Sequence, residues 1–331
     1  MTPRLTLAHL PTPLERLPRL SSELGVDLWI KRDDASGGVE AGNKIRKLEF
    51  LLGAACAEVA DVVITCGALQ SNHCRATAAA CARLGLGCVV LLRVADPSVP
   101  APLEGNVLLM RMLGAEIRLV TPVEYADRSA RMASVADEHR ARGKRPYVIP
   151  EGGSNALGSL GYVEAMREIR EQLDLGLGGR DRFDVVVHAC GSGGTAAGVA
   201  LGCAVSGVAP RVLAIAVCDS SAYFTSVADR IVAEARSVDP LLPAPVTLDV
   251  DDRFKGPAYG VASAEQRAFV VAMARSHGLV LDPVYTGKAL FGLAGAIAAD
   301  PALKGARVLF LHTGGLPGLL AAGSSLAGEL G

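Results

Sequence analysis

The sequence is poor in aromatic residues and has almost no net charge. Only 4% of its 331 residues are Phe, Trp or Tyr, whereas 50% are hydrophobic and 37 are glycine. Lys and Arg total 33 against 34 Asp and Glu, which gives a formal net charge of −1. A chain without an excess of charge has no long-range field that would attract nucleic acid or an anionic membrane. We therefore expect neither of these partners.

The sequence also lacks a recognisable targeting segment, a membrane span and paired cysteines. Residues 1–10 have no apolar core after a basic start, and no apolar stretch reaches the roughly 18 residues that a spanning helix needs. The eight cysteines lie among Ala, Val and Leu, without C-x-x-C pairs or histidines at metal-ligand spacing. These absences predict a cytoplasmic protein with buried free thiols and no metal site.

What the chain does contain is a regular alternation of short apolar runs with helical stretches. The runs are apolar at nearly every position, as expected for strands buried on both faces of a parallel sheet. We predict strands at residues 27–31, 62–65, 88–92, 116–120, 147–149, 184–188, 212–217 and 308–312. Helices are predicted at residues 45–59, 72–84, 122–142, 157–173, 196–206 and 264–277. This alternation indicates an α/β protein, and the length favours two domains.

Two glycine-bearing turns lead from a predicted strand into a predicted helix. The first covers residues 65–73 (TCGALQSNH), in which Ser71 or Asn72 can cap the helix. The second covers residues 188–198 (HACGSGGTAAG). Free N–H groups at the start of a helix, together with the positive end of its dipole, bind anions. The sequence thus offers two anion sites.

The second turn by itself leaves its ligand open. Its Gly191-x-Gly193-x-x-Ala196 spacing fits a relaxed dinucleotide fingerprint, with Asp219 after the next strand as a ribose acceptor. It also fits a phosphate cup for another cofactor, or a turn with only a structural role. A nicotinamide-dependent oxidoreductase is therefore the alternative function from a different class.

Lys44 is distinguished by its setting, since most lysines are solvated surface residues. It follows Gly42 and Asn43 at the start of an amphipathic helix. There the helix dipole and the neighbouring cations Arg46 and Lys47 would lower the pKa of its amine and favour Schiff-base chemistry.

Three hydroxyl-bearing residues in turn-like sequence are further candidates, and each has an ordinary structural explanation. Tyr259 and Tyr285 can simply pack a ring and hydrogen-bond a hydroxyl. Thr313 can cap the last helix. None of these signals decides the function alone.

Taken in order, eight segments resemble the D-cysteine desulfhydrase and 1-aminocyclopropane-1-carboxylate (ACC) deaminase family of pyridoxal-phosphate (PLP) enzymes. They are residues 10–14 (LPTPL), 29–34 (WIKRDD), 42–49 (GNKIRKLE), 70–73 (QSNH), 150–155 (PEGGSN), 191–195 (GSGGT), 282–285 (DPVY) and 312–315 (HTGG). The set covers nearly the whole chain and favours a phosphate cup for the glycine loop. One departure is Ala41, where the family usually has a second glycine before Gly42.

The resemblance implies the tryptophan synthase β-like fold of PLP enzymes, fold type II, with open twisted sheets and helices on both faces in each of two domains. A large PLP-binding domain would combine residues 1–47 with residues 160–331, and a small domain would comprise residues 48–159. The cofactor would lie in the cleft between them, and closure of the small domain would expel water. The family also implies a homodimer that acts on a small amino acid.

The resemblance assigns a role to each candidate. The catalytic residues would be Lys44, which would hold PLP as a Schiff base, with Ser71, Tyr259 and Tyr285. Further cofactor contacts would come from Lys47, Asn72, Gly191, Ser192, Gly193, Gly194, Thr195 and Thr313. The substrate would contact Ser71, Asn72, His73, Tyr259 and Tyr285, the first three at its carboxylate.

The implied reaction converts D-cysteine to pyruvate, hydrogen sulfide and ammonia, with Lys44 as the general base at Cα. ACC deaminases resemble one another in an acidic residue after the second tyrosine and a leucine before the terminal Gly-Gly, where this chain has Thr286 and Thr313. A neutral hydroxyl holds a ring nitrogen protonated less firmly than a carboxylate, which is sufficient for a good leaving group such as a thiolate. The alternatives within the class are L-cysteate sulfo-lyase and ACC deaminase.

Overall fold

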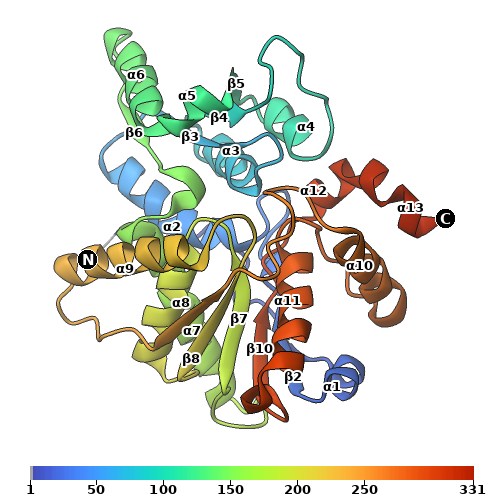
Figure 1. Cartoon of the computed structure of the whole chain (residues 1–331). Coiled ribbons are helices and arrows are strands. Elements are labelled where there is room, and N and C mark those ends of the chain that lie inside the picture. Colours follow the sequence, from blue (N-terminus) through green and yellow to red (C-terminus); the bar gives the residue numbers. More distant parts are fainter. Residues whose placement is uncertain (1–2) are drawn as a thin grey trace.

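The structure is a computed structural model that describes residues 3–331 and contains two sheets (Figure 1). Residues 1 and 2, with which the predicted large domain begins, lie outside the described residues. The larger sheet has the strand order β1-β2-β10-β7-β8-β9 and is parallel except where β1 pairs with β2. Its strands are β1 (Leu14–Arg16), β2 (Asp27–Lys31), β7 (Val185–Cys190), β8 (Arg211–Ala216), β9 (Thr247–Asp251) and β10 (Arg307–Leu311). The smaller sheet is wholly parallel, in the order β5 (Glu116–Val120), β4 (Gly87–Arg93), β3 (Val62–Ala68) and β6 (Pro146–Val148).

Helices connect the strands and cover both sheets (Figure 1). The α-helices are α1 (Pro18–Leu24), α2 (Asn43–Ala57), α3 (Asn72–Leu84), α4 (Gly105–Met112), α5 (Pro122–Ala126), α6 (Arg128–Ala141), α7 (Ala156–Asp174), α8 (Gly194–Ser206), α9 (Ser221–Val238), α10 (Ala264–His277), α11 (Thr286–Ala299), α12 (Leu316–Ala321) and α13 (Ala327–Leu330). Short 3₁₀-helices are η1 (Asp33–Ala35), η2 (Glu151–Gly153), η3 (Pro301–Leu303) and η4 (Gly323–Leu326). None of the helices in residues 3–331 has the length and apolar character that crossing a membrane requires.

The larger sheet is buried on both faces, which confirms the predicted α/β class. Successive residues of β10 enter different cores: Val308 and Phe310 pack with α11, whereas Leu309 and Leu311 pack with α7 and α8. The smaller sheet is covered in the same way, by α2, α3 and α4 on one face and by α5 and α6 on the other. Strands with two buried faces have apolar residues at every position, and this is why their sequences reveal them.

The predicted elements differ from the structure at the sheet edges and in the helices. The helices α1, α4, α9, α11, α12 and α13 lie outside the predicted ranges, and one predicted helix is divided. All eight predicted strands are present with small shifts in their bounds, but β1 and β9 are additional strands. Both are edge strands with largely polar, partly exposed sequences (LER and TLDVD), so they lack the apolar run that identifies a strand. The helix predicted at residues 122–142 is two helices, because the backbone of Asp127 (φ −103°, ψ 42°) ends α5 before α6 begins.

Each sheet is built from one side of the predicted division of the chain. Strands of the larger sheet lie within residues 14–31 and 185–311, and those of the smaller sheet within residues 62–148. The predicted boundaries at 47/48 and 159/160 fall inside α2 and α7, which pack against each other. The domain division itself stays a prediction.

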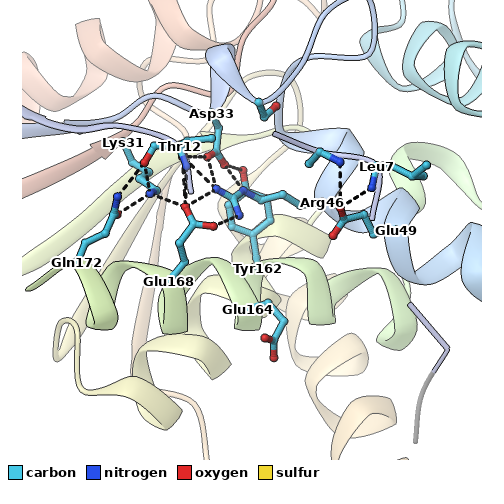
Figure 2. Close-up of polar contacts among 12 residues, drawn as sticks. Leu7, Thr12, Lys31, Asp33, Arg46, Glu49, Tyr162, Glu164, Glu168 and Gln172 are labelled. Atoms are coloured by element: carbon cyan, nitrogen blue, oxygen red, sulfur yellow. Dashed lines mark hydrogen bonds and ion pairs between the residues drawn. The ribbon is translucent and has the colours of Figure 1, made fainter. Parts of the chain in front are cut away.

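Helix α2 is held in place by a cluster of buried charges around Arg46 (Figure 2). Its guanidinium donates to both carboxylate oxygens of Asp33, at 2.8 and 3.0 Å, and to both of Glu168, at 2.8 and 3.0 Å. Lys31 pairs with Glu168 at 2.5 Å, and the Tyr162 hydroxyl donates to Asp33 at 2.6 Å. Burial opposes ionisation of the two carboxyls, but Arg46 more than offsets it, so the pKa of each lies below its ordinary value. The cluster fixes α2 against α7 and the end of β2.

We predict that Arg46→Met lowers the free energy of unfolding by about 3–5 kcal/mol, because the carboxylates of Asp33 and Glu168 lose their buried partner. Urea denaturation measures the loss. The matched control is Arg140→Met, which removes an exposed arginine paired with Asp137 and should change stability little. A loss below about 1 kcal/mol for Arg46→Met would show that the cluster is not what holds α2.

Candidate active site

A pocket lies where strands of both sheets end, and most of its lining residues lie at or just after the carboxyl ends of β3, β6, β7 and β10. Ligands of open α/β sheets bind at such edges. The lining residues are Asn43, Lys44, Gly67, Ala68, Ser71, Asn72, His73, Glu151, Gly152, Ala189, Cys190, Gly191, Ser192, Gly193, Thr195, Ala196, Tyr259, Tyr285 and Thr313. The structure thus brings together all the predicted site residues except Lys47 and Gly194, which lie directly behind the lining.

Lys44 lies in the first turn of α2, with its Nζ 3.4 Å from the carbonyl oxygen of Gly152. The turn begins at Gly42, whose φ is +118° and where a Cβ would lie 2.9 Å from the carbonyl oxygen of Thr313. Burial lowers the pKa of the Lys44 amine to about 8. The direction agrees with the sequence prediction, but the main cause is desolvation rather than a neighbouring cation, since carboxylates neutralise Arg46.

Lys47 is buried, and its acceptors are neutral. Its Nζ lies 3.3 Å from the carbonyl oxygen of Gly152 and 3.5 Å from the hydroxyl of Ser154. Desolvation, and next the charge of Lys44, hold the pKa of Lys47 well below its ordinary value. A Cβ on Gly194 would lie 2.8 Å from the Cα of Ser154 and 2.9 Å from this amine, and because the first contact is with backbone, only glycine lets α8 begin so close. An anion at this helix start would compensate the charge.

The glycine loop forms the start of α8, with Gly193 (φ +77°) as the N-cap. The N–H of Ala197 donates to the carbonyl of Gly193. The N–H groups of Thr195 and Ala196 precede it in the first turn, where the helix offers no acceptor. Both residues line the pocket. With Lys47 behind them, these N–H groups suit a phosphate group.

A second helix start, that of α3, opens onto the same pocket. Ser71 caps it, because its hydroxyl accepts a hydrogen bond from the N–H of Cys74 at 3.2 Å. A Cβ on Gly67 would lie 2.5 Å from that hydroxyl oxygen, so the cap requires glycine there. The N–H groups of Asn72 and His73 lie in the first turn without an acceptor in the helix. The two predicted anion sites therefore meet in one pocket.

Asn106 in α4 sets the orientation of Asn72, and the sequence analysis misses it. Arg75 Nε donates to Asn106 Oδ1 at 3.0 Å, and because a guanidinium has only donors, this contact fixes which way the Asn106 amide faces. Asn106 Nδ2 then donates to Asn72 Oδ1 at 3.1 Å. The Asn72 Nδ2 group is left to donate into the pocket. Arg75 also donates to the carbonyl of Ala41 at 3.0 Å and so holds the loop before Lys44.

The imidazole of His73 is neutral and presents an acceptor rather than a donor. The Thr65 hydroxyl donates to the carbonyl of Ile149 at 2.8 Å, so it accepts from His73 Nε2 at 2.9 Å. His73 Nδ1 is then unprotonated, and it has no partner among the described residues. Burial, and next Lys44 and Lys47, hold the pKa of His73 well below its ordinary value. The predicted contact of His73 with a substrate carboxylate can therefore be made only by its backbone N–H.

The two predicted tyrosines lie against each other at the pocket. The hydroxyl oxygens of Tyr259 and Tyr285 are 2.5 Å apart, and the rings meet edge to face. Burial raises the pKa of both phenols, so both keep their protons at neutral pH. Arg93, at the end of β4, lies over the ring of Tyr259 at 5.7 Å and over that of Tyr125 at 5.1 Å. The smaller sheet thus contacts the tyrosine pair.

Glu151 is the one carboxylate among the pocket-lining residues of the described chain, and sequence reasoning gave it no role. Tyr125 donates to one of its oxygens at 2.7 Å, and Arg128 pairs with the other at 3.0 Å. Its charge is thus engaged on the side of the smaller sheet. The only signal for it was its place in the segment PEGGSN.

Thr286 and Thr313, which distinguish this sequence from ACC deaminases, lie in different surroundings. Thr313 lines the pocket, whereas Thr286 is not among the lining residues and is fully buried. The Thr286 hydroxyl donates to Asp282 Oδ1 at 2.7 Å and accepts from the Asp282 N–H at 2.9 Å. Of the two threonines, only Thr313 can therefore contact a cofactor ring in the pocket. Asp219, the ribose acceptor of the dinucleotide interpretation, is exposed and does not line the pocket.

Cys190 is the one cysteine that lines this pocket of the described residues. Burial raises the pKa of its thiol to about 11, so it stays protonated and is a poor nucleophile. All eight cysteines are free, and residues 3–331 contain no group of three or more His, Cys, Asp or Glu that could hold a metal ion.

The chain is similar to known proteins over nearly its whole length. Residues 5–314 match the family model described as pyridoxal-phosphate dependent enzyme. The chain is 43% identical to the mitochondrial bifunctional D-cysteine desulfhydrase/1-aminocyclopropane-1-carboxylate deaminase of Arabidopsis thaliana, covering 95% of this chain and 78% of that protein. It is 43% identical to D-cysteine desulfhydrase of Klebsiella pneumoniae, covering 96% of each. A crystal structure of an ACC deaminase homologue is 37% identical, with a TM-score of 0.88 over 99% of this chain and 96% of that one.

We predict that Lys47→Met raises the unfolding temperature of the ligand-free protein, because it removes a buried amine that has no carboxylate partner. Inorganic phosphate should stabilise the wild-type protein and bind the variant at least about tenfold more weakly, a loss of about 1.4 kcal/mol. Calorimetric titration measures this affinity. Lys144→Met, which changes an exposed lysine, is the control and should leave it unchanged. Equal phosphate affinities of wild type and Lys47→Met would exclude Lys47 from the anion site.

Proposed function

This chain belongs to the pyridoxal-phosphate-dependent enzymes, and we propose that within this family it is a carbon–sulfur lyase that converts D-cysteine to pyruvate, hydrogen sulfide and ammonia. The observation that carries the proposal is the half-buried Lys44, which lines one pocket together with two open helix starts. A cofactor phosphate and a substrate carboxylate are the two anions that this enzyme class has to hold. Its 43% identical relatives are named for the same reaction.

The described residues fit pyridoxal phosphate. Lys47 lacks a compensating carboxylate at a helix start that a Cβ on Gly194 would obstruct. The phosphate would be held there, the aldehyde by Lys44, and the ring by Asn72 and Thr313. When bound, the cofactor supplies an electrophilic carbon for an amine and a ring that withdraws the electron pair left at Cα.

The chain's own groups supply binding and proton transfer. The first turn of α3 binds the substrate carboxylate through the N–H groups of Asn72 and His73. Lys44 takes the proton from Cα, for which a pKa of about 8 leaves part of the amine neutral near physiological pH. Tyr259 and Tyr285 retain their protons and hydrogen-bond the departing sulfur.

D-Cysteine is favoured over a cyclopropane substrate by Thr313, which lines the pocket. Thr313 is neutral, and a hydroxyl stabilises a protonated ring nitrogen less than a carboxylate does. Loss of a thiolate needs less electron withdrawal than opening of a carbon ring. ACC deamination is the second candidate, because relatives and a solved homologue carry that name.

We predict sulfide and pyruvate from D-cysteine, with 2-oxobutanoate from ACC formed at least about tenfold more slowly, a difference of about 1.4 kcal/mol in the barrier. L-Cysteine and L-cysteate complete the panel. Lys44→Ala is the control and should lose at least about 10³-fold in turnover, since it lacks the general base. Equal rates with ACC would replace the assignment by ACC deaminase, and faster sulfite release from L-cysteate would replace it by L-cysteate sulfo-lyase.

We also propose that the protein is a homodimer. Exposed apolar side chains gather on α4 and α12, two helices that pack against each other: Leu108, Met112, Leu316 and Leu320. Met112 is 74% exposed and Leu320 is 70% exposed. Exposed apolar side chains on neighbouring helices are typical of a protein interface.

Sedimentation equilibrium should give twice the chain mass of 34.2 kDa for the wild-type protein. Met112→Glu with Leu320→Glu should shift the mass toward the monomer, because two carboxylates would then be buried without partners. The control is Leu177→Glu, at a site that is 55% exposed and lies outside these helices. A monomeric wild-type protein would refute the dimer.

The free state of all eight cysteines supports a reducing, cytoplasmic setting. Cell fractionation with an antibody to the protein tests it, and recovery with a membrane or an oxidising compartment would contradict it.

A further inference from the structure

Lys288 is a buried lysine whose charge no part of the proposed reaction uses. It lies in the first turns of α11 and is 0% exposed. Its Nζ donates to three backbone carbonyls: those of Val217 at 3.1 Å, Lys255 at 2.6 Å and Ala258 at 3.0 Å. An ammonium group has three N–H donors, so this set of acceptors uses all of them.

Two of these carbonyls belong to the irregular segment that carries Tyr259. Lys255 and Ala258 precede it, and the segment closes around the lysine at Gly256. There φ is +73°, and a Cβ would lie 3.3 Å from Lys288 Cε. Residues 252–260 form no strand or helix of their own. Phe254 packs on Phe291 and Gly295 of α11, and Lys288 adds the hydrogen bonds that tie the backbone of the segment to this helix.

The same lysine lies one turn beyond Tyr285 on α11. Tyr285 is at the start of this helix, and its hydroxyl is 2.5 Å from that of Tyr259. One side chain therefore joins the segment of the first tyrosine to the helix of the second. Lys288 itself does not line the pocket.

The buried ammonium group of Lys288 makes the fold less stable than an apolar side chain would. Burial of a charge bonded only to neutral carbonyls costs free energy that an apolar side chain of similar length would avoid. The desolvation is also seen in the pKa of Lys288, which burial lowers to about 8. The residue gains hydrogen bonds to three chain segments in return.

We propose that Lys288 is a positioning residue, which fixes the tyrosine hydroxyl pair by tying the segment before Tyr259 to the helix that begins at Tyr285. The catalytic part of this inference rests on the proposed function, in which the pair contacts the substrate. The mechanical part, the tie itself, does not.

The test compares Lys288→Met with Lys255→Met in the full-length enzyme loaded with pyridoxal phosphate. The control makes the same change in the same segment, where the side chain is 37% exposed. In Lys288→Met, amides of residues 252–262 should exchange hydrogen at least about tenfold faster, because their anchor is lost. Lys255→Met should exchange like the wild type. The content of bound cofactor should stay that of the wild type in both.

Turnover provides the second measurement. Lys288→Met should lower kcat for D-cysteine about 10- to 100-fold, the effect of a displacement of about 1 Å. In a Tyr259→Phe background the same change should lower kcat by less than about twofold, because the residue acts through that hydroxyl. A general loss of stability would instead reduce kcat by the same factor in both backgrounds.

If the amides of residues 252–262 exchange at the wild-type rate in Lys288→Met, the lysine does not anchor this segment. If Lys288→Met lowers kcat by the same factor with and without Tyr259→Phe, the lysine has no positioning role. Exchange is measured without substrate, so its result stands even if D-cysteine proves not to be the substrate. If Lys288→Met does not fold, Lys288→Gln, which keeps two donors, and Gly256→Ala, which perturbs the contact from the segment, take its place with the same expected outcomes.

Discussion

The pairing of Arg46 with Asp33 and Glu168 is the interaction on which the site depends (Figure 2). Residues three apart on a helix share a face, whereas residues one or two apart do not. With Arg46 turned to its carboxylates, Lys44 and Lys47 turn together toward the pocket, where their acceptors are neutral. The cluster satisfies one cation of the helix turn and leaves the amines of Lys44 and Lys47 for the ligand site.

Other parts of the pocket also present polar groups that a ligand can bind. Two helix starts present N–H groups without acceptors, and Asn106 directs the Asn72 amide away from the protein. Such donors are already oriented before the ligand binds, so binding requires little reorganisation. The free protein is less stable for it, and the bound ligand supplies the missing partners.

The sequence predicts the buried strands and the residues that line the pocket better than it predicts which partner each side chain bonds. Buried strands and glycine turns leave local patterns, and the order of the segments singles out Lys44 as a candidate. Edge strand β9 has no such sequence pattern, because its residues are half exposed. Asn106 and Lys288 act on residues 34 and 71 positions away, contacts that exist only in the fold. Thr286 adjoins Tyr285 in sequence, yet its hydroxyl bonds Asp282, because consecutive residues of a helix face different directions.

Strand β10 lies between β2 and β7, although it is the last strand along the chain. During translation, β2 and β7 are complete long before residue 307 leaves the ribosome, and until then they have no neighbour between them (Figure 1). At synthesis rates of about 5–20 residues per second, this interval lasts several seconds for the 117 residues from Cys190 to Arg307. The larger sheet is therefore completed only after most of the chain has been made. Until then a nascent chain lacks β10, and it also lacks Thr313, so its pocket is incomplete.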